Sequence, residues 1–105
     1  MLGELEQLVL LAVLRGGRET YGVPVHAEIL RRSGRSVAVA SVYKTLDRLS
    51  HKGFLSSRVG EPTSERGGRR KTYFAVTASG RRELRASLAT LRRMARGLDV
   101  GLEPS

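Results

Sequence analysis

The sequence predicts a mainly α-helical domain that carries one small β-hairpin. Apolar residues recur at helical spacing in four segments, and two short segments between residues 54 and 76 are rich in aromatic and β-branched residues. Glycines follow the first three helical segments, and a threonine precedes the last one. A chain of 105 residues forms one domain with a single modest core.

The first two predicted helices cover residues 3–15 and 22–33. The first is apolar around most of its circumference, so we expect it to be buried between its own domain and another chain. Gly16 and Gly17 end it. For the second helix we expect Thr20 as the N-cap and Gly34 as the exit. A short connection follows, with one extended pair expected near residues 36 and 37.

The third predicted helix, residues 39–52, has two contrasting faces and ends at Gly53. At 100° per residue one arc is apolar and should face the core, and it holds Val39, Val42, Leu46 and Leu49. The opposite arc is small, polar and basic, and it holds Ala40, Ser41, Lys44, Asp47, Arg48 and His51. Tyr43 lies on the flank between the arcs. Taken alone, the polar arc is typical of a solvated helix face.

Residues 54–59 and 70–76 are predicted strands, joined by the loop segment "GEPTSERGGRR". Together they form a hairpin with a long basic tip, where Gly67 and Gly68 allow a tight turn or a close backbone approach to a ligand. The neighbouring bases Arg69 and Arg70 suit contact with phosphate or with a minor groove. Two helices joined by a short turn and followed by this hairpin indicate a winged helix-turn-helix domain, residues 1–76.

The last predicted helix runs from 78 to 96 and is capped by Thr77. Apolar residues spaced alternately by four and three form a short coiled-coil seam, which holds Leu84, Leu88, Leu91, Ala95 and Leu98. About two heptads are too few to hold a dimer alone. We therefore expect residues 77–98 to be a dimerisation helix that acts with Leu8 and Leu11 of the first helix, and residues 99–105 to be a disordered tail.

The charge of the chain is strongly and unevenly basic. Lys and Arg number 19 against 10 acidic residues, the net charge is +9, and the isoelectric point is about 11.2. Residues 1–30 carry two arginines and four glutamates, so residues 31–105 carry all of the positive excess. Such a distribution indicates a partner that is a polyanion, with nucleic acid, an acidic protein and a membrane surface as alternatives.

Several other classes of function lack the residues that they need. The chain has no Cys, which excludes disulfides and thiolate metal sites. His26 and His51 fall on different predicted helices without a carboxylate cluster, and no catalytic or phosphate-binding motif can be assembled. We therefore expect no enzyme, no metal and no cofactor. The N-terminus does not resemble a secretory signal, and the apolar run at residues 8–14 is too short to cross a membrane, so we expect a cytoplasmic protein.

Four segments of the chain resemble the PadR family of bacterial transcription regulators: "LGELEQLVLLAVL", "YGVPVHAEI", "SVYKTLDRLSHKGFL" and "ERGGRRKTYFAVTASGRREL". The resemblance covers about residues 2–90. It implies a homodimer whose third helix enters the major groove of a palindromic operator in double-stranded DNA, while the wing touches backbone or minor groove. Positions expected to meet DNA match Ser41, Tyr43 and Lys44. Tyr21 matches a phosphate-binding position, and Arg69 and Arg70 match the wing.

The sequence therefore favours a homodimeric, sequence-specific DNA-binding regulator that represses by occluding a promoter. Its expected DNA contacts are Tyr21, Ser41, Tyr43, Lys44, Arg48, Arg69 and Arg70, and its expected dimer contacts are Leu8, Leu11, Leu84, Leu88 and Leu91. Two alternatives stay open, a winged-helix module that docks another protein and a nonspecific architectural DNA binder. An unidentified small-molecule effector also stays open, since family members respond to such compounds.

Overall fold

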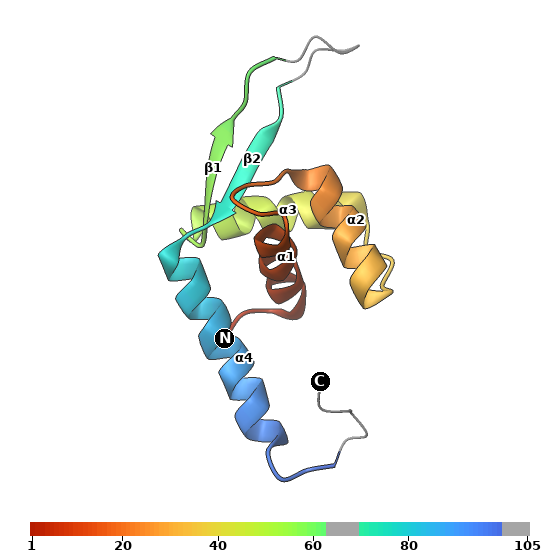
Figure 1. The fold of residues 1–105 in the computed structure, drawn as a ribbon, viewed down its shortest axis with the longest axis vertical. Helices are drawn as coiled ribbons and strands as arrows, with labels where there is room; N and C mark the ends of the chain where they lie inside the picture. Colours follow the sequence, from red (N-terminus) through yellow and green to blue (C-terminus); the bar gives the residue numbers. More distant parts are fainter. Residues whose placement is uncertain (63–69, 100–105) are drawn as a thin grey trace.

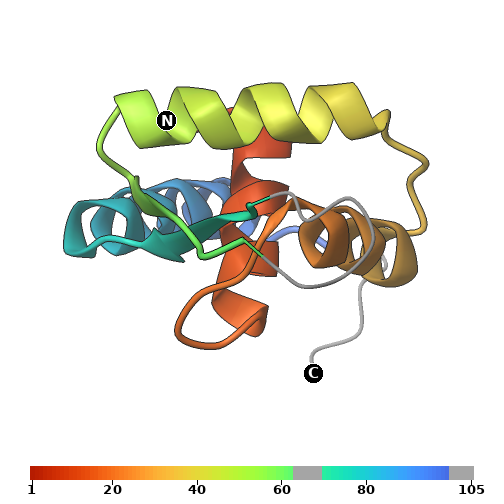
Figure 2. The same cartoon turned by 90° about the horizontal axis from the view of Figure 1, so that it is seen from above.

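The computed structural model describes residues 1–62 and 70–99, and it has the helix and strand order that the sequence predicts. Its elements are α1 (Glu4–Arg15), α2 (Gly22–Ser33), α3 (Val39–His51), β1 (Leu55–Val59), β2 (Thr72–Val76) and α4 (Ala78–Ala95). The helix α1 contacts α2, α3, α4 and β2, so it is the centre of the fold (Figure 2). The hairpin projects from one end of the molecule, and α4 runs away from it (Figure 1).

One apolar core holds these elements together. Its fully buried members come from three helices and include Val9, Leu10, Val13, Val25, Val42, Leu46 and Leu49. Leu55 and Phe74 of the hairpin and Leu84 of α4 join the same cluster. Because every element contributes to one core, the orientation of α3 and of the hairpin is fixed by shared packing.

The ends of the helices follow the predicted signals with one exception. Gly34 ends α2 in the left-handed conformation with φ 70°, and Thr77 caps α4 by accepting a hydrogen bond from the Gly80 backbone at 3.0 Å. The predicted cap at Thr20 is wrong. Thr20 pairs through its backbone with Phe74, and Tyr21 precedes α2 without a side-chain cap.

The backbone pairing of Thr20 adds a third, one-residue strand to the hairpin. The strands β1 and β2 are antiparallel, with Leu55 opposite Val76 and Val59 opposite Thr72. Thr20 and Phe74 exchange N–H to carbonyl hydrogen bonds of 3.0 and 2.7 Å. Residues 36 and 37, where an extended pair is expected, form no strand or bridge, and the Val37 carbonyl accepts a hydrogen bond from His26 at 2.8 Å.

An ion pair fastens the start of α1 to the end of α3. The buried Glu6 carboxylate accepts hydrogen bonds from Lys52 Nζ at 2.7 Å and from the Gly3 backbone N–H at 2.9 Å. Burial alone would raise the pKa of Glu6, but these two hydrogen bonds, with the charges of Lys52 and Arg48, lower the pKa below its ordinary value.

A lowered carboxylate pKa makes folding stability depend on pH with a defined sign. The Glu6 contribution is present above the pKa of the unfolded chain and is lost as the pH falls through the lower, folded-state pKa. We expect Glu6→Gln to reduce the free energy of unfolding by about 1–2 kcal/mol near neutral pH, and by much less near roughly pH 2. Urea unfolding at several pH values measures this. Glu4→Gln, at an exposed pair with Arg35, is the control and should change little.

Candidate nucleic-acid interface

The helix α3 is anchored by one face and presents the other to solvent. Val42, Leu46 and Leu49 are fully buried, as the apolar arc predicts. Val39 was expected in that arc, but 51% of it is exposed. It is the first residue of the helix, and its side chain points toward the N-terminus and past the edge of the core.

The exposed face of α3 carries most of the predicted polar residues. Tyr43, Lys44, Asp47, Arg48 and His51 are exposed. Ser41 is half-buried, and its carbonyl accepts a hydrogen bond from the buried Thr45 hydroxyl at 2.8 Å. The structure therefore leaves Lys44 and Arg48 on the open face and places Ser41 at its border.

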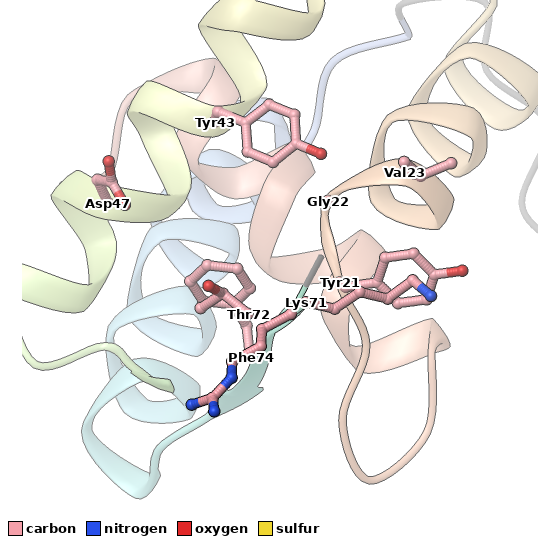
Figure 3. A pocket seen from close by; sticks show the side chains of 9 residues that line it. Tyr21, Gly22, Val23, Tyr43, Asp47, Lys71, Thr72 and Phe74 are labelled. Carbon is pink, nitrogen blue, oxygen red and sulfur yellow. The ribbon is translucent and has the colours of Figure 1, made fainter. Parts of the chain in front are cut away.

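Tyr43 lies against the first residue of α2. A Cβ atom at Gly22 would come within 2.4–2.6 Å of two ring carbons and the hydroxyl oxygen of Tyr43, so a side chain at this position would displace the ring. With glycine there, Tyr43 packs between α3 and α2 while 43% of it stays exposed (Figure 3). In the Tyr21-Gly22 pair, Tyr21 thus supplies an aromatic side chain, and Gly22 leaves the space that Tyr43 occupies.

The loop end of the hairpin brings further cations to the same side. Arg70 is exposed, and Lys71 is half-buried with its ammonium 5.1 Å from the centre of the Tyr21 ring. Arg69 and the rest of the predicted wing tip lie outside the described residues. The structure therefore positions Arg70, and it leaves the role of Arg69 as a prediction.

These elements surround one pocket of about 310 Å³ (Figure 3). Its lining residues come from the start of α2, from α3 and from the hairpin: Tyr21, Gly22, Val23, Tyr43, Asp47, Arg70, Lys71, Thr72 and Phe74. The sequence placed Tyr21, Tyr43 and Arg70 in separate segments, and the fold brings them together. Two tyrosines beside two cations offer hydrogen-bond donors and positive charge to an anion.

The cations at this surface have few internal partners. Within the described parts of the chain, no ion pair engages Lys44, Arg48 or Arg70. The charge of Arg48 helps to lower the pKa of Glu6, so Arg48 already interacts with a carboxylate of the protein itself. Lys44 therefore has the more available charge of the two cations on α3.

The family model of the PadR-like transcriptional regulators matches residues 10–86 of the chain. The chain belongs to the PadR-like family. It is a transcriptional regulator with a DNA-binding winged helix. A comparison with curated proteins finds no match.

Solved structures share the fold over nearly the whole chain. A PadR family regulator from Eggerthella lenta is 25% identical, covers 97% of this chain and 88% of its own, and has a TM-score of 0.69. A PadR family regulator from Clostridium difficile is 20% identical, with coverages of 92% and 96% and a TM-score of 0.74. Bacillus subtilis PadR, solved in complex with operator DNA, is 20% identical with a TM-score of 0.69. It matches 97% of this chain and 50% of its own.

A second surface of this PadR-like chain is an apolar groove between α1 and α4. It is lined by Met1, Leu2, Glu4, Gln7, Leu8, Leu11, Leu88 and Leu91. The groove includes four of the five predicted dimer residues. The fifth, Leu84, is 4% exposed and lies in the core of its own chain, so its side chain is already covered. The buried Ser87 accepts a hydrogen bond from the Leu2 backbone at 2.9 Å, which ties the N-terminus to α4 beside this groove.

Three residues that hold the hairpin in place are not predicted as site residues from the sequence. Arg58 contacts both Glu19 and Tyr73, although the three residues lie in different segments. The available signal was weak. Tyr73 directly precedes the buried Phe74, and Arg58 lies three positions after the buried Leu55, so period-two alternation directs both side chains to the outer face. Nothing in a single sequence pairs either of them with Glu19.

The described part of the chain shows no helix that is both long and apolar enough to span a membrane.

The two histidines take part in local backbone contacts. His26 donates to the Val37 carbonyl in the turn between α2 and α3, and His51 donates to the Asp47 carbonyl one turn earlier in α3 at 2.9 Å.

Proposed function

We propose that this PadR-like regulator binds a palindromic operator as a homodimer, with α3 in the major groove and the hairpin against backbone or minor groove. Residues 1–76 would form the DNA-binding domain, and residues 77–98 the dimerisation helix. Binding that covers a promoter would repress transcription. Regulators with this mechanism act by binding DNA, and no enzymatic activity is part of the proposal.

One observation carries the proposal: the convergence of α2, α3 and the hairpin on a single cationic surface. Tyr21, Tyr43, Arg70 and Lys71 surround one pocket, and Lys44 and Arg48 are exposed on the neighbouring face of α3. A helix with one buried face and one polar face, flanked by basic groups that suit phosphate, matches how helix-turn-helix proteins dock on a duplex. The Bacillus subtilis relative of the same fold has been solved with operator DNA, which supports duplex DNA as the ligand.

Fluorescence anisotropy of a labelled duplex tests this function directly. The duplex comes from the region upstream of the protein's own coding sequence, with a scrambled duplex of the same composition as the control. We expect binding tighter to the native duplex by about a thousandfold at moderate salt. Equal and steeply salt-dependent binding to both would favour an architectural binder. Absence of binding at low salt would favour a module that docks a protein.

We expect Lys44→Ala to reduce specificity more than general affinity. A lysine that reads a base edge contributes about 1–3 kcal/mol, so binding to the native duplex should weaken roughly 10- to 100-fold and binding to scrambled DNA should weaken less. Anisotropy with both duplexes measures the ratio. The control Arg82→Ala removes one exposed charge from α4 and should leave the ratio unchanged. An equal loss on both duplexes would make Lys44 a phosphate contact.

Dimerisation in this proposal uses the groove between α1 and α4. Its lining includes Leu8, Leu11, Leu88 and Leu91. Met94 near the end of α4 and Leu98 just beyond it are further exposed apolar side chains. Two copies related by a two-fold axis would place two α3 helices about one turn of DNA apart, or a small multiple of it. An effector that binds near this interface stays open.

A further inference from the structure

The outer face of the hairpin carries a chain of side-chain contacts that the proposed DNA contacts do not explain. Arg58 pairs with Glu19, and its guanidinium lies 4.7 Å from the centre of the Tyr73 ring. The Tyr73 ring meets the Tyr21 ring edge to face, with centres 5.7 Å apart and planes at 71°. Lys71 then lies over the other tyrosine, Tyr21. The contacts run without a break from β1 to the start of α2.

The strand register explains why these side chains meet. Arg58 is the direct partner of Tyr73 across the two strands, and Thr20 pairs with Phe74, the next residue of β2. Successive side chains on a strand point to opposite faces, so Thr20 and Phe74 enter the core, where both are buried. Glu19, Tyr21 and Tyr73 are therefore directed to the outer face. Consecutive residues 19, 20 and 21 each contact the hairpin, two through side chains and one through its backbone.

Arg58 is occupied within the protein. Its Nε donates to Glu19 Oε2 at 2.9 Å, and its terminal nitrogen donates to Glu19 Oε1, which makes a bidentate pair. The hydrogen bonds from Arg58 hold the pKa of Glu19 below its ordinary value. The Tyr73 ring covers one side of the same guanidinium. Composition alone would count Arg58 among the cations available to DNA, but its donors already face a carboxylate.

We propose that Glu19, Arg58 and Tyr73 form a clamp that fixes the hairpin to the start of α2 and thereby positions Tyr21 and Lys71. These three are positioning residues and do not touch the nucleic acid. The clamp sets the distance between two elements whose side chains line the same pocket. Its role in binding rests on the proposed function, whereas its role in holding the hairpin can be measured without DNA.

The alternative explanation is that Arg58 contacts phosphate directly. The clamp and the phosphate contact predict opposite effects of one substitution on the affinity for DNA. Glu19→Gln removes a negative charge and releases Arg58. If Arg58 bound phosphate, this substitution would strengthen DNA binding. If the clamp is correct, the affinity falls, and we expect a three- to tenfold loss despite the more favourable net charge. Glu61→Gln is the matched control, because it removes an exposed carboxylate just beyond β1; it should leave affinity unchanged or slightly higher.

Two further comparisons separate the clamp from general damage to the fold. Tyr73→Phe keeps the ring and should bind DNA like the unchanged protein, whereas Tyr73→Leu should lose affinity about as much as Glu19→Gln. The double variant Glu19→Gln with Arg58→Gln should be no weaker than Arg58→Gln alone, since both remove the same pair. Affinity that rises with Glu19→Gln, or a Tyr73→Leu variant that binds normally, would overturn the clamp.

Amide hydrogen exchange of the free protein completes the test. The N–H groups of Thr20 and Phe74 donate to each other's carbonyls, so their protection reports whether the hairpin stays joined to the segment before α2. We expect faster exchange at both amides in Glu19→Gln and Tyr73→Leu, and unchanged exchange in Tyr73→Phe and Glu61→Gln. Unchanged exchange in the first two variants contradicts the clamp. If the unchanged protein binds no DNA, the proposed function fails and the exchange result still decides the clamp.

Discussion

Gly80→Ala should destabilise the protein by about 3 kcal/mol, although alanine is the better helix former. Gly80 lies in the first turn of α4, where a Cβ atom would be 2.2 Å from the Phe54 carbonyl oxygen and 3.0 Å from the carbonyl carbon. These atoms belong to the backbone, so they cannot swing aside. The same carbonyl accepts the Thr77 N–H at 3.1 Å, and Thr77 donates its hydroxyl proton to the Gly53 carbonyl at 2.7 Å.

Urea unfolding followed by circular dichroism measures this effect. Ser79→Ala is the matched control, since it changes the preceding position of the same turn and should shift the free energy of unfolding by less than about 0.5 kcal/mol. A Gly80→Ala variant as stable as the unchanged protein would show that α4 can move away from residue 54. The Thr77-x-x-Gly80 motif would then have no steric basis.

The sequence predicts the helices well because their signals are local. Gly34 and Thr77 fix helix ends through their own backbone conformation and hydrogen bonds, and α1, α2 and α4 begin or end within one residue of the prediction. The strands are one and two residues shorter than predicted, at 55–59 and 72–76. A strand ends where its partner stops pairing, and the partner is not visible in the local sequence.

Contacts between distant segments account for the remaining differences between the sequence-based predictions and the structure. The pairing of Thr20 with Phe74 joins residues far apart in the chain through a single bridge, too short to produce an alternating pattern. The ion pair of Glu19 with Arg58 also joins distant segments, 39 residues apart in the chain. Composition alone counts one acidic and one basic residue and gives no sign that they pair. In the candidate site, the exposure of Lys44 and Arg48 followed from helical periodicity. The packing of Tyr43 on Gly22 depends on how two helices cross, and only the structure shows it.

Leu91→Asp should convert the proposed dimer to a monomer and weaken operator binding by about a hundredfold or more. Leu91 lines the groove between α1 and α4 and is 46% exposed, so its side chain can be replaced without opening the core. An unpaired carboxylate in an apolar interface is strongly unfavourable. Leu88 is a less suitable position, because it packs against the core of its own chain. Its replacement would destabilise the fold, and loss of the dimer could then not be distinguished from unfolding.

Sedimentation velocity measures the oligomeric state, and anisotropy with the native duplex measures the affinity. Ala86→Asp introduces the same residue on the solvent face of the same helix, so it controls for charge and helix propensity and should stay dimeric. The two measurements should change together, because a monomer presents only one α3 and loses the linked binding of the second half-site. A Leu91→Asp protein that remains dimeric would remove this part of α4 from the interface. A monomer with undiminished affinity would show that one copy suffices for recognition.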